Sequence, residues 1–274
     1  MKSHAICILS KVPHEITLDF IQNLYNEDYD VYVCIDHLNI NIPKLNCKTI
    51  KILKIDGELC KRIGYYGSVD YCKDRACSRD KALYHFCCLN ATYDYVWFIE
   101  EDVFIPKKHT LINLDKKYQN YDLLSQEHII NKGDNKAEYW QHWDKNMGQI
   151  KYPWAKSMIC AIRVSKKLLQ HIKSYVDMNN KLLFDEMLFN TIALQNNLLV
   201  CCPDELQHIT FTFDDLNIKN INETYLYHPI RNIQKHDDYR KTPINYRIIV
   251  ARYNENIDWL SKLINNTIIY NKGI

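Results

Sequence analysis

The stretch YDYVWFIEEDVFIP, residues 93–106, decides the fold that we expect, because its apolar run ends in three acids, Glu100, Glu101 and Asp102. A short apolar run bounded by charge is typical of a strand that is buried on both faces of a sheet. In open α/β sheets, ligands bind beyond the carboxyl ends of such strands. Three adjacent carboxylates repel one another and resist burial unless a cation offsets their charge. The stretch therefore predicts a buried strand that ends at a ligand site.

On both sides of this strand, short apolar runs alternate with amphipathic ones, as they do in βαβ units. Before it, the pattern predicts strands at residues 4–12, 30–37 and 49–55, and helices at 15–26 and 78–92. After it, the pattern predicts strands at 121–129, 157–165 and 198–203, and helices at 109–120, 166–179 and 183–197. We therefore expect an α/β fold with a mostly parallel, twisted sheet flanked by helices.

No internal repeat interrupts this pattern, so we expect residues 1–243 to form one domain. Residues 131–149 lack a strong period and are typical of a loop or lid. Residues 244–274 predict a further strand and helix. These last residues are either a terminal βα extension or the start of another domain.

The composition gives no reason to expect a nucleic-acid or bilayer partner, because 35 Lys and Arg nearly balance 33 Asp and Glu. No run approaches 18 apolar residues, and the first residues do not resemble a secretion signal. High Asn, Ile, Lys and Tyr with only six glycines is typical of an AT-rich coding sequence, such as that of a large DNA virus or a protist. We expect a cytoplasmic protein, in the host cytoplasm or the virion if viral.

The eleven cysteines are expected to be reduced and mostly buried. Their number is odd, and Cys7, Cys34, Cys160 and Cys201 lie inside apolar runs. The two adjacent pairs lack the C-x-x-C spacing of structural zinc sites. The spacing therefore gives no reason to expect a structural zinc.

A divalent cation would relieve the repulsion among the three acids. Carboxylate oxygens suit Mg²⁺ or Mn²⁺, which complete their coordination with the phosphates of a substrate. The alternative is that the acids only end a strand at the surface, as solvated charge clusters usually do.

The run VWFIEED, residues 96–102, resembles the metal-binding motif of GT-A fold nucleotide-sugar glycosyltransferases, in which a strand ends in D-x-D or a variant such as E-D-D. The resemblance implies that Asp102 contacts Mn²⁺ or Mg²⁺ directly. It implies that Glu100, which replaces the usual first Asp, faces the ribose or reaches the metal through water. The implied donor is a nucleotide sugar, with a UDP-sugar preferred.

The same resemblance implies donor-binding residues at three other places. Ser10 and Asp36 lie near the ends of the first two predicted strands, and the resemblance places Asp36 beside the uracil. Arg79 and Lys81 begin the helix before the acidic strand, where the family has groups that reach the donor. As alternatives, Asp36 is an ordinary turn residue, and the two cations lie in a solvated first turn, which the helix dipole disfavours.

The late stretch YLYHPIRN, residues 225–232, carries two more candidates. Many GT-A enzymes have a late histidine as a third protein ligand of the metal, so the resemblance implies this role for His228. Arg231 is close enough in the sequence to meet a diphosphate. The alternative for His228 is a packed or surface histidine.

A second pair of acids, Asp185 and Glu186, lies in the first turn of the predicted helix at 183–197. The helix dipole stabilises negative charge there, and a carboxylate could accept the proton of an acceptor hydroxyl. Successive residues diverge by about 100° around a helix, so we expect one acid to face the cleft. The sequence does not choose between them, and simple dipole complementation is the alternative.

Aromatic residues offer an acceptor platform, because flat amphipathic rings suit the apolar faces of sugars. Trp140, Trp143, Tyr152 and Trp154 gather in one stretch, and we expect Tyr152 and Trp154 to contact the acceptor. A hydrophobic plug under a loop is the alternative.

The sequence thus predicts a metal-dependent glycosyltransferase of hexosyltransferase type that moves a sugar to a hydroxyl of a glycan or glycoprotein. Two other classes remain open. A nucleotidyltransferase acting on sugar phosphates usually has a Gly-rich basic loop after the first strand, whereas here that loop is SKVPHEI. A non-catalytic sugar- or nucleotide-binding module would bind without turnover.

Overall fold

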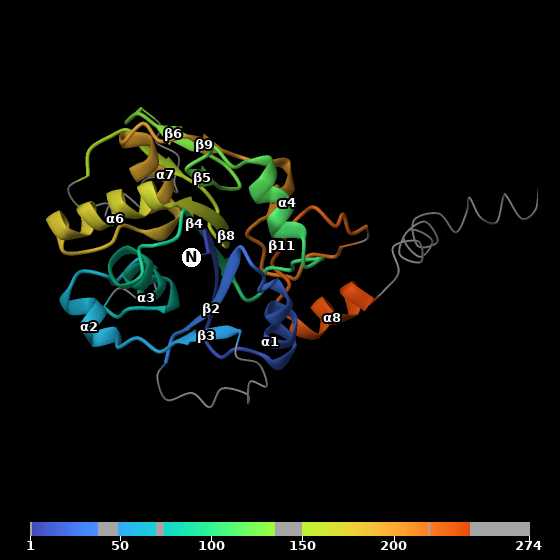
Figure 1. The fold of residues 1–274 in the computed structure, drawn as a ribbon. Coiled ribbons are helices and arrows are strands. Elements are labelled where there is room, and N and C mark those ends of the chain that lie inside the picture. The colour runs from blue at the N-terminus through green and yellow to red at the C-terminus, as the bar shows by residue number, and fades with distance from the viewer. Residues whose placement is uncertain (1, 38–48, 70–73, 135–149, 219, 242–274) are drawn as a thin grey trace, which may run out of the picture.

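A seven-stranded sheet forms the centre of the protein in the computed structural model, which describes residues 2–37, 49–69, 74–134, 150–218 and 220–241. The strand order is β3-β2-β1-β4-β8-β5-β9, and the sheet twists through the middle of the molecule (Figure 1). β4 lies at its centre between β1 and β8. The acidic stretch therefore belongs to a central strand, as the sequence predicts.

The sheet is parallel except at β8, which runs antiparallel to both of its neighbours. Its strands are β1 (His4–Ser10), β2 (Tyr29–Ile35), β3 (Ile50–Leu53), β4 (Tyr95–Glu100), β5 (Leu123–Leu124), β8 (Ala161–Ser165) and β9 (Val200–Cys201). Two small sheets pair β6 (Ile129–Asn131) with β7 (Trp154–Lys156) and β10 (His208–Ile209) with β11 (Tyr227–His228). The mostly parallel α/β fold is therefore confirmed.

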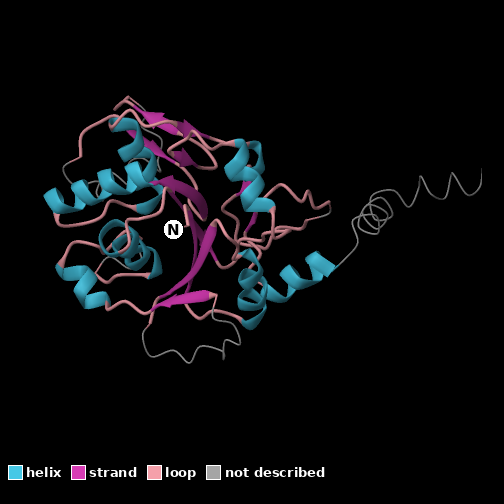
Figure 2. Cartoon of the chain, in the orientation of Figure 1, coloured by secondary structure: helices cyan, strands magenta, loops and turns pink. Residues whose placement is uncertain are grey.

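Helices cover both faces of the sheet, as the cartoon shows (Figure 2). One layer contains α2 (Gly57–Arg62), α3 (Ser78–Tyr84), α6 (Lys166–Asn179) and α7 (Asp185–Gln195). The other contains α1 (Glu15–Ile21), α4 (Thr110–Lys117) and α8 (Ile233–Lys241) (Figure 1).

Two hydrophobic cores, one on each face, explain why the run in β4 is continuous rather than alternating. Phe98 packs in the core under α3 and α7, whereas Trp97 and Ile99 pack in the core on the other face. All four residues 96–99 are buried because strands at the centre of a covered sheet have no solvated face. Burial therefore ends where the charges begin, at the carboxyl end of the strand.

Several predicted elements differ in extent from the observed ones. The helix expected at 78–92 is α-helical only to Tyr84 and continues as a π-helical turn at His85–Leu89. The strand expected at 157–165 begins at Ala161, and the one expected at 121–129 is split into β5 and β6. The short helix α2 and the late helix α8 are absent from the predicted elements. Boundaries such as these depend on tertiary contacts rather than on local pattern.

Three features of the sequence lie outside the described residues. The first is the main part of the predicted lid, residues 135–149, which includes Trp140 and Trp143. The second is the predicted extension at 244–274, and the third is the end of the predicted domain at residues 242 and 243. Within the described part of the chain, no helix is both long enough and apolar enough to cross a bilayer.

Candidate active site

The three acids at the end of β4 have different surroundings. Glu101 accepts hydrogen bonds from the Ser10 hydroxyl and, at 2.7 Å, from the backbone N–H of His14. Glu101 thus ties the loop after β1 to the end of β4. Glu100 and Asp102 point to the other side, toward His228, with side chains that are 34% and 26% exposed. The structure therefore leaves two of the three acids for a ligand.

His228 lies between these two carboxylates. Its Nε2 atom is 3.4 Å from Asp102 Oδ1 and 3.8 Å from Glu100 Oε2. Its Nδ1 atom is 2.8 Å from the carbonyl oxygen of Thr210, which can only accept a hydrogen bond, so Nδ1 carries a proton. This contact fixes the ring with Nε2 directed at the acids, which is how metal-ligating histidines are usually held.

Backbone contacts bring this histidine to the acidic strand from more than 120 residues away in the chain. Phe104 and Tyr227 form an antiparallel bridge, and the N–H of Ile230 donates to the carbonyl oxygen of Asp102 at 2.8 Å. Strand β11 also pairs with β10, which carries the Thr210 segment alongside. The late stretch 225–232 is therefore held against the end of β4.

His228 and Asp102 shift each other's pKa toward the charged form. Burial lowers the pKa of His228, but the contact with Asp102 and the charge of Glu100 outweigh this effect and raise it overall. Burial likewise raises the pKa of Asp102, and the His228 contact reverses the shift and lowers it. Each of the two groups therefore favours the charged form of the other.

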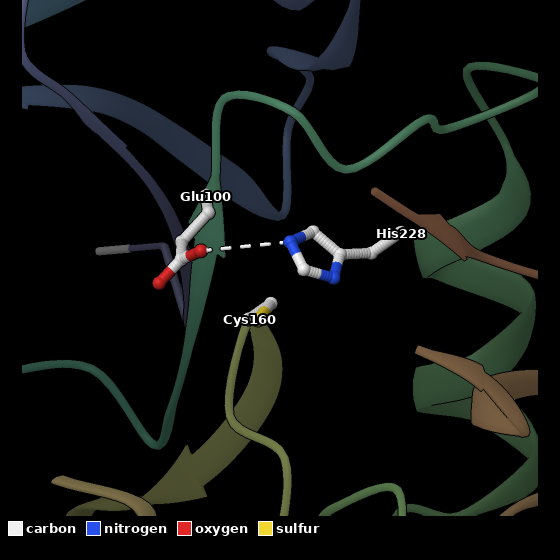
Figure 3. Close-up of side chains that lie close together, drawn as sticks. All are labelled: Glu100, Cys160 and His228. Carbon is white, nitrogen blue, oxygen red and sulfur yellow. Dashed lines mark ion pairs between the residues drawn. The ribbon is translucent and has the colours of Figure 1, made fainter. Parts of the chain in front are cut away.

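A thiol that the sequence analysis did not select, Cys160, completes the cluster. The ligand atoms of Glu100, Cys160 and His228 lie within 4.8 Å of one another (Figure 3). The N–H of Glu100 donates to the carbonyl oxygen of Cys160 at 2.8 Å, which places the cysteine just before β8 and beside the end of β4. This contact depends on the antiparallel pairing of β8 with β4. No local pattern in the sequence predicts that pairing.

Arg79 links the two groups of acids. Its guanidinium is buried, forms an ion pair with Glu100, and lies 3.3 Å from Asp185 through Nε. It also donates to the carbonyl oxygen of Ile159 at 3.0 Å. Burial lowers the pKa of Arg79, but Asp185 and Glu100 raise it overall, so the guanidinium remains charged.

The two acids that begin α7 have raised pKa values. Burial raises the pKa of Asp185 to about 8, although Arg79 opposes the shift. Burial raises the pKa of Glu186 to about 7, with Lys156 and then Arg79 opposing it. Asp185 is 4% exposed, whereas Glu186 is only partly buried. The structure thus separates a buried acid paired with arginine from a more accessible acid that titrates near neutrality.

Asp185 predicts a pH dependence of folding. Its folded pKa is raised above the unfolded value of about 4, so its contribution to stability is complete below pH 4 and is lost as pH rises to about 8. We expect Asp185→Asn to gain stability relative to the wild type as pH rises from 5 to 8, measured by urea unfolding. Equal pH slopes for both proteins would show that Asp185 titrates normally.

A cavity of about 470 Å³ opens beside the cluster, at the carboxyl ends of β1, β2 and β4. Six of the residues predicted from the sequence line it, namely Ser10, Asp36, Arg79, Glu100, Asp102 and Arg231. Asp36 accepts a hydrogen bond from the N–H of Ser78, which also lines the cavity. Arg231 donates to the carbonyl oxygens of Thr212 and Phe213 at 2.7 and 3.0 Å.

The structure does not support direct donor contact by Lys81. Its side chain is buried, and its ammonium donates to the backbone carbonyl oxygens of Ile35 and Asp36. Lys81 therefore fixes the end of β2, because carbonyls that leave a strand need donors. Lys81 is not among the residues that line the cavity, whereas Arg79, two residues earlier in α3, is.

The predicted aromatic platform is also corrected in part. Trp154 is 4% exposed, belongs to the core under α6 and α7, and donates from Nε1 to the carbonyl oxygen of Ile150 at 3.1 Å. Tyr152 is exposed and stacks on Trp154 with ring centroids 4.0 Å apart. Trp154 therefore supports a surface ring instead of presenting its own face.

No protein-family model matches the chain, and no curated protein sequence matches it. Among solved structures, an active-site mutant of LgtC is similar with a TM-score of 0.47, and the galactosyltransferase LgtC in complex with donor and acceptor sugar analogues with 0.43. Each is 9% identical and covers 89% of this chain and 99% of its own.

Proposed function

We propose that this protein is a metal-dependent glycosyltransferase that uses a nucleotide-sugar donor, with a UDP-sugar preferred, and transfers a hexose to a hydroxyl acceptor. One observation carries the proposal. Two carboxylates and an oriented imidazole meet at the carboxyl end of the central strand, beside a cavity of about 470 Å³. Polar groups that converge on a cavity of a few hundred Å³ are typical of small-molecule sites.

The side chains of Asp102, Glu100 and His228 fit Mn²⁺ or Mg²⁺. The carboxylate oxygens are the ligand type that these ions prefer, and Thr210 fixes the imidazole so that its nitrogen would add a third ligand. Arg79 binds one oxygen of Glu100 and leaves the other directed at His228. When bound, the cation would offset the negative charge of the departing diphosphate. His228 would give up its Nε2 proton on binding.

Other lining residues have clear roles toward the donor in this proposal. The carboxylate of Asp36, at the end of β2, would accept hydrogen bonds from the base or the ribose, while Ser78 holds it in place. Arg231, whose guanidinium is fixed by two carbonyls, would contact the diphosphate. Ser10, at the end of β1, would lie beside the donor while its hydroxyl donates to Glu101.

The two acids of α7 have different roles in this proposal. Glu186 is the more accessible, and a carboxylate with a pKa near 7 suits proton transfer at physiological pH. Asp185 would act as a positioning residue, because it holds Arg79, which in turn holds Glu100. Tyr152 would contact the acceptor with its exposed ring.

Incubation with Mn²⁺ and a panel of UDP-sugars tests the proposal, with sugar transfer and slow donor hydrolysis as readouts. We expect turnover by the wild type, and we expect Asp102→Ala to weaken Mn²⁺-dependent UDP binding by about 100-fold or more, since even indirect partners of metal ligands matter by 10- to 100-fold. Asp19→Ala, which removes an exposed acid from α1, is the matched control and should change neither readout.

Absence of turnover together with unchanged nucleotide binding by Asp102→Ala would refute the glycosyltransferase. Pyrophosphate release from a nucleoside triphosphate and a sugar phosphate would instead identify a nucleotidyltransferase. Calorimetric binding of UDP-sugar without any turnover would identify a binding module.

A further inference from the structure

The proposed donor-metal centre contains a sulfur atom that a centre built only for Mn²⁺ or Mg²⁺ does not need. Cys160 is 6% exposed. Its Sγ and the ligand atoms of Glu100 and His228 all lie within 4.8 Å of one another (Figure 3). These three residues come from three separate segments, at the end of β4, just before β8 and in β11. Cys160 belongs to the hydrophobic core on one face of the sheet, and its thiol also lies beside the ligand atoms of Glu100 and His228.

The spacing of these atoms suits a small tetrahedral ion. Bonds of about 2.0 to 2.3 Å to oxygen, nitrogen and sulfur place neighbouring ligands about 3.3 to 3.8 Å apart around zinc. The two Nε2 to carboxylate distances are 3.4 Å for Asp102 and 3.8 Å for Glu100.

The chemistry of the ligands decides which ion gains from the sulfur. Thiolate is a soft ligand that selects zinc and its neighbours, whereas Mn²⁺ and Mg²⁺ prefer oxygen. Divalent affinities also rise from Mn²⁺ toward Zn²⁺ for a given set of nitrogen, oxygen and sulfur ligands. A carboxylate, imidazole and thiolate set is therefore biased strongly toward zinc.

We propose that Cys160 makes this centre a zinc site, so that Zn²⁺ bound by Glu100, Cys160 and His228 displaces the cation that supports donor binding. Zinc would then regulate the enzyme by competition at its own metal position. The regulatory consequence rests on the proposed glycosyltransferase function, whereas zinc binding itself rests only on the three side chains. The sequence spacing of the cysteines does not predict this site, because its ligands are far apart in the chain.

Cobalt is the probe for the test, since Co²⁺ occupies zinc sites and a sulfur ligand adds thiolate-to-cobalt absorption in the near ultraviolet. We expect the full chain to show this absorption and Cys160→Ser to lack it. We expect Cys160→Ser to weaken Zn²⁺ binding by about 100-fold or more in a competition with a chelating dye, because a direct ligand should matter at least as much as an indirect one. Mn²⁺ affinity should change less than about threefold.

Cys202→Ser is the matched control, because Cys202 is an exposed thiol next to a second cysteine. Absorption that survives Cys160→Ser, or that disappears in Cys202→Ser, would overturn the proposal. Equal losses of Zn²⁺ and Mn²⁺ affinity in Cys160→Ser would also overturn it, since they indicate general damage to the centre. Cobalt absorption in a protein with no transfer activity would refute the glycosyltransferase and leave the zinc site standing.

Discussion

Replacement of Arg79 by methionine should destabilise the protein by about 3 to 5 kcal/mol, measured as the change in free energy of unfolding in urea. Breaking a buried ion pair by removing one partner costs about this much, because the remaining charge loses its compensation. Arg79 serves Glu100 and Asp185 together and also donates to the carbonyl oxygen of Ile159. Methionine fills a similar volume, so the loss reflects charge and hydrogen bonds more than packing.

Two further variants make the effect of Arg79 specific. Arg62→Met, at the exposed end of α2, should change stability by less than about 0.5 kcal/mol. The double variant Arg79→Met with Asp185→Asn should recover part of the loss, since a neutral amide needs no cation. The loss in Arg79→Met should be smaller at pH 6 than at pH 8.5, because Asp185 takes up a proton at the lower pH. A double variant no more stable than the single one would contradict this account.

The fold was largely predictable because its signals are local. The continuous apolar run in residues 95–99 indicates a strand that is buried on both faces. The amphipathic pattern of residues 166–179 indicates a helix that is buried on one face. What the pattern could not supply is strand order and direction. β8 is buried along its whole length, as residues 96–99 of β4 are, yet it is antiparallel and inserts between β4 and β5.

Some residues of the candidate site could likewise be predicted from local pattern, whereas others depend on strand order and packing. Ser10, Asp36 and Glu100 follow or end parallel strands, so their meeting at one edge of the sheet follows from the topology. Cys160 reaches the site only through the antiparallel register. The sequence could not distinguish Lys81 from Arg79, because the first turn of a helix offers several directions and only packing decides which side chain faces the cavity.

Kinetic measurements should distinguish the roles of the two acids in α7, Asp185 and Glu186. Glu186→Gln should lower kcat by about 100- to 10,000-fold, the range for loss of a general base, with little change in the donor KM. Because the base must be deprotonated, wild-type activity should rise as pH passes through about 7 and then level off. The residual activity of Glu186→Gln should lack that rise.

Asp185→Asn distinguishes a base from a positioning residue. The asparagine keeps the shape of the side chain, and Arg79 keeps its ion pair with Glu100, so we expect kcat to fall by less than about tenfold. Glu186→Gln should not lose stability, since a neutral amide is buried at less cost than a carboxylate. Lost activity without lost stability in Glu186→Gln is therefore the result that assigns the base. A larger loss of kcat in Asp185→Asn than in Glu186→Gln would transfer the role to Asp185.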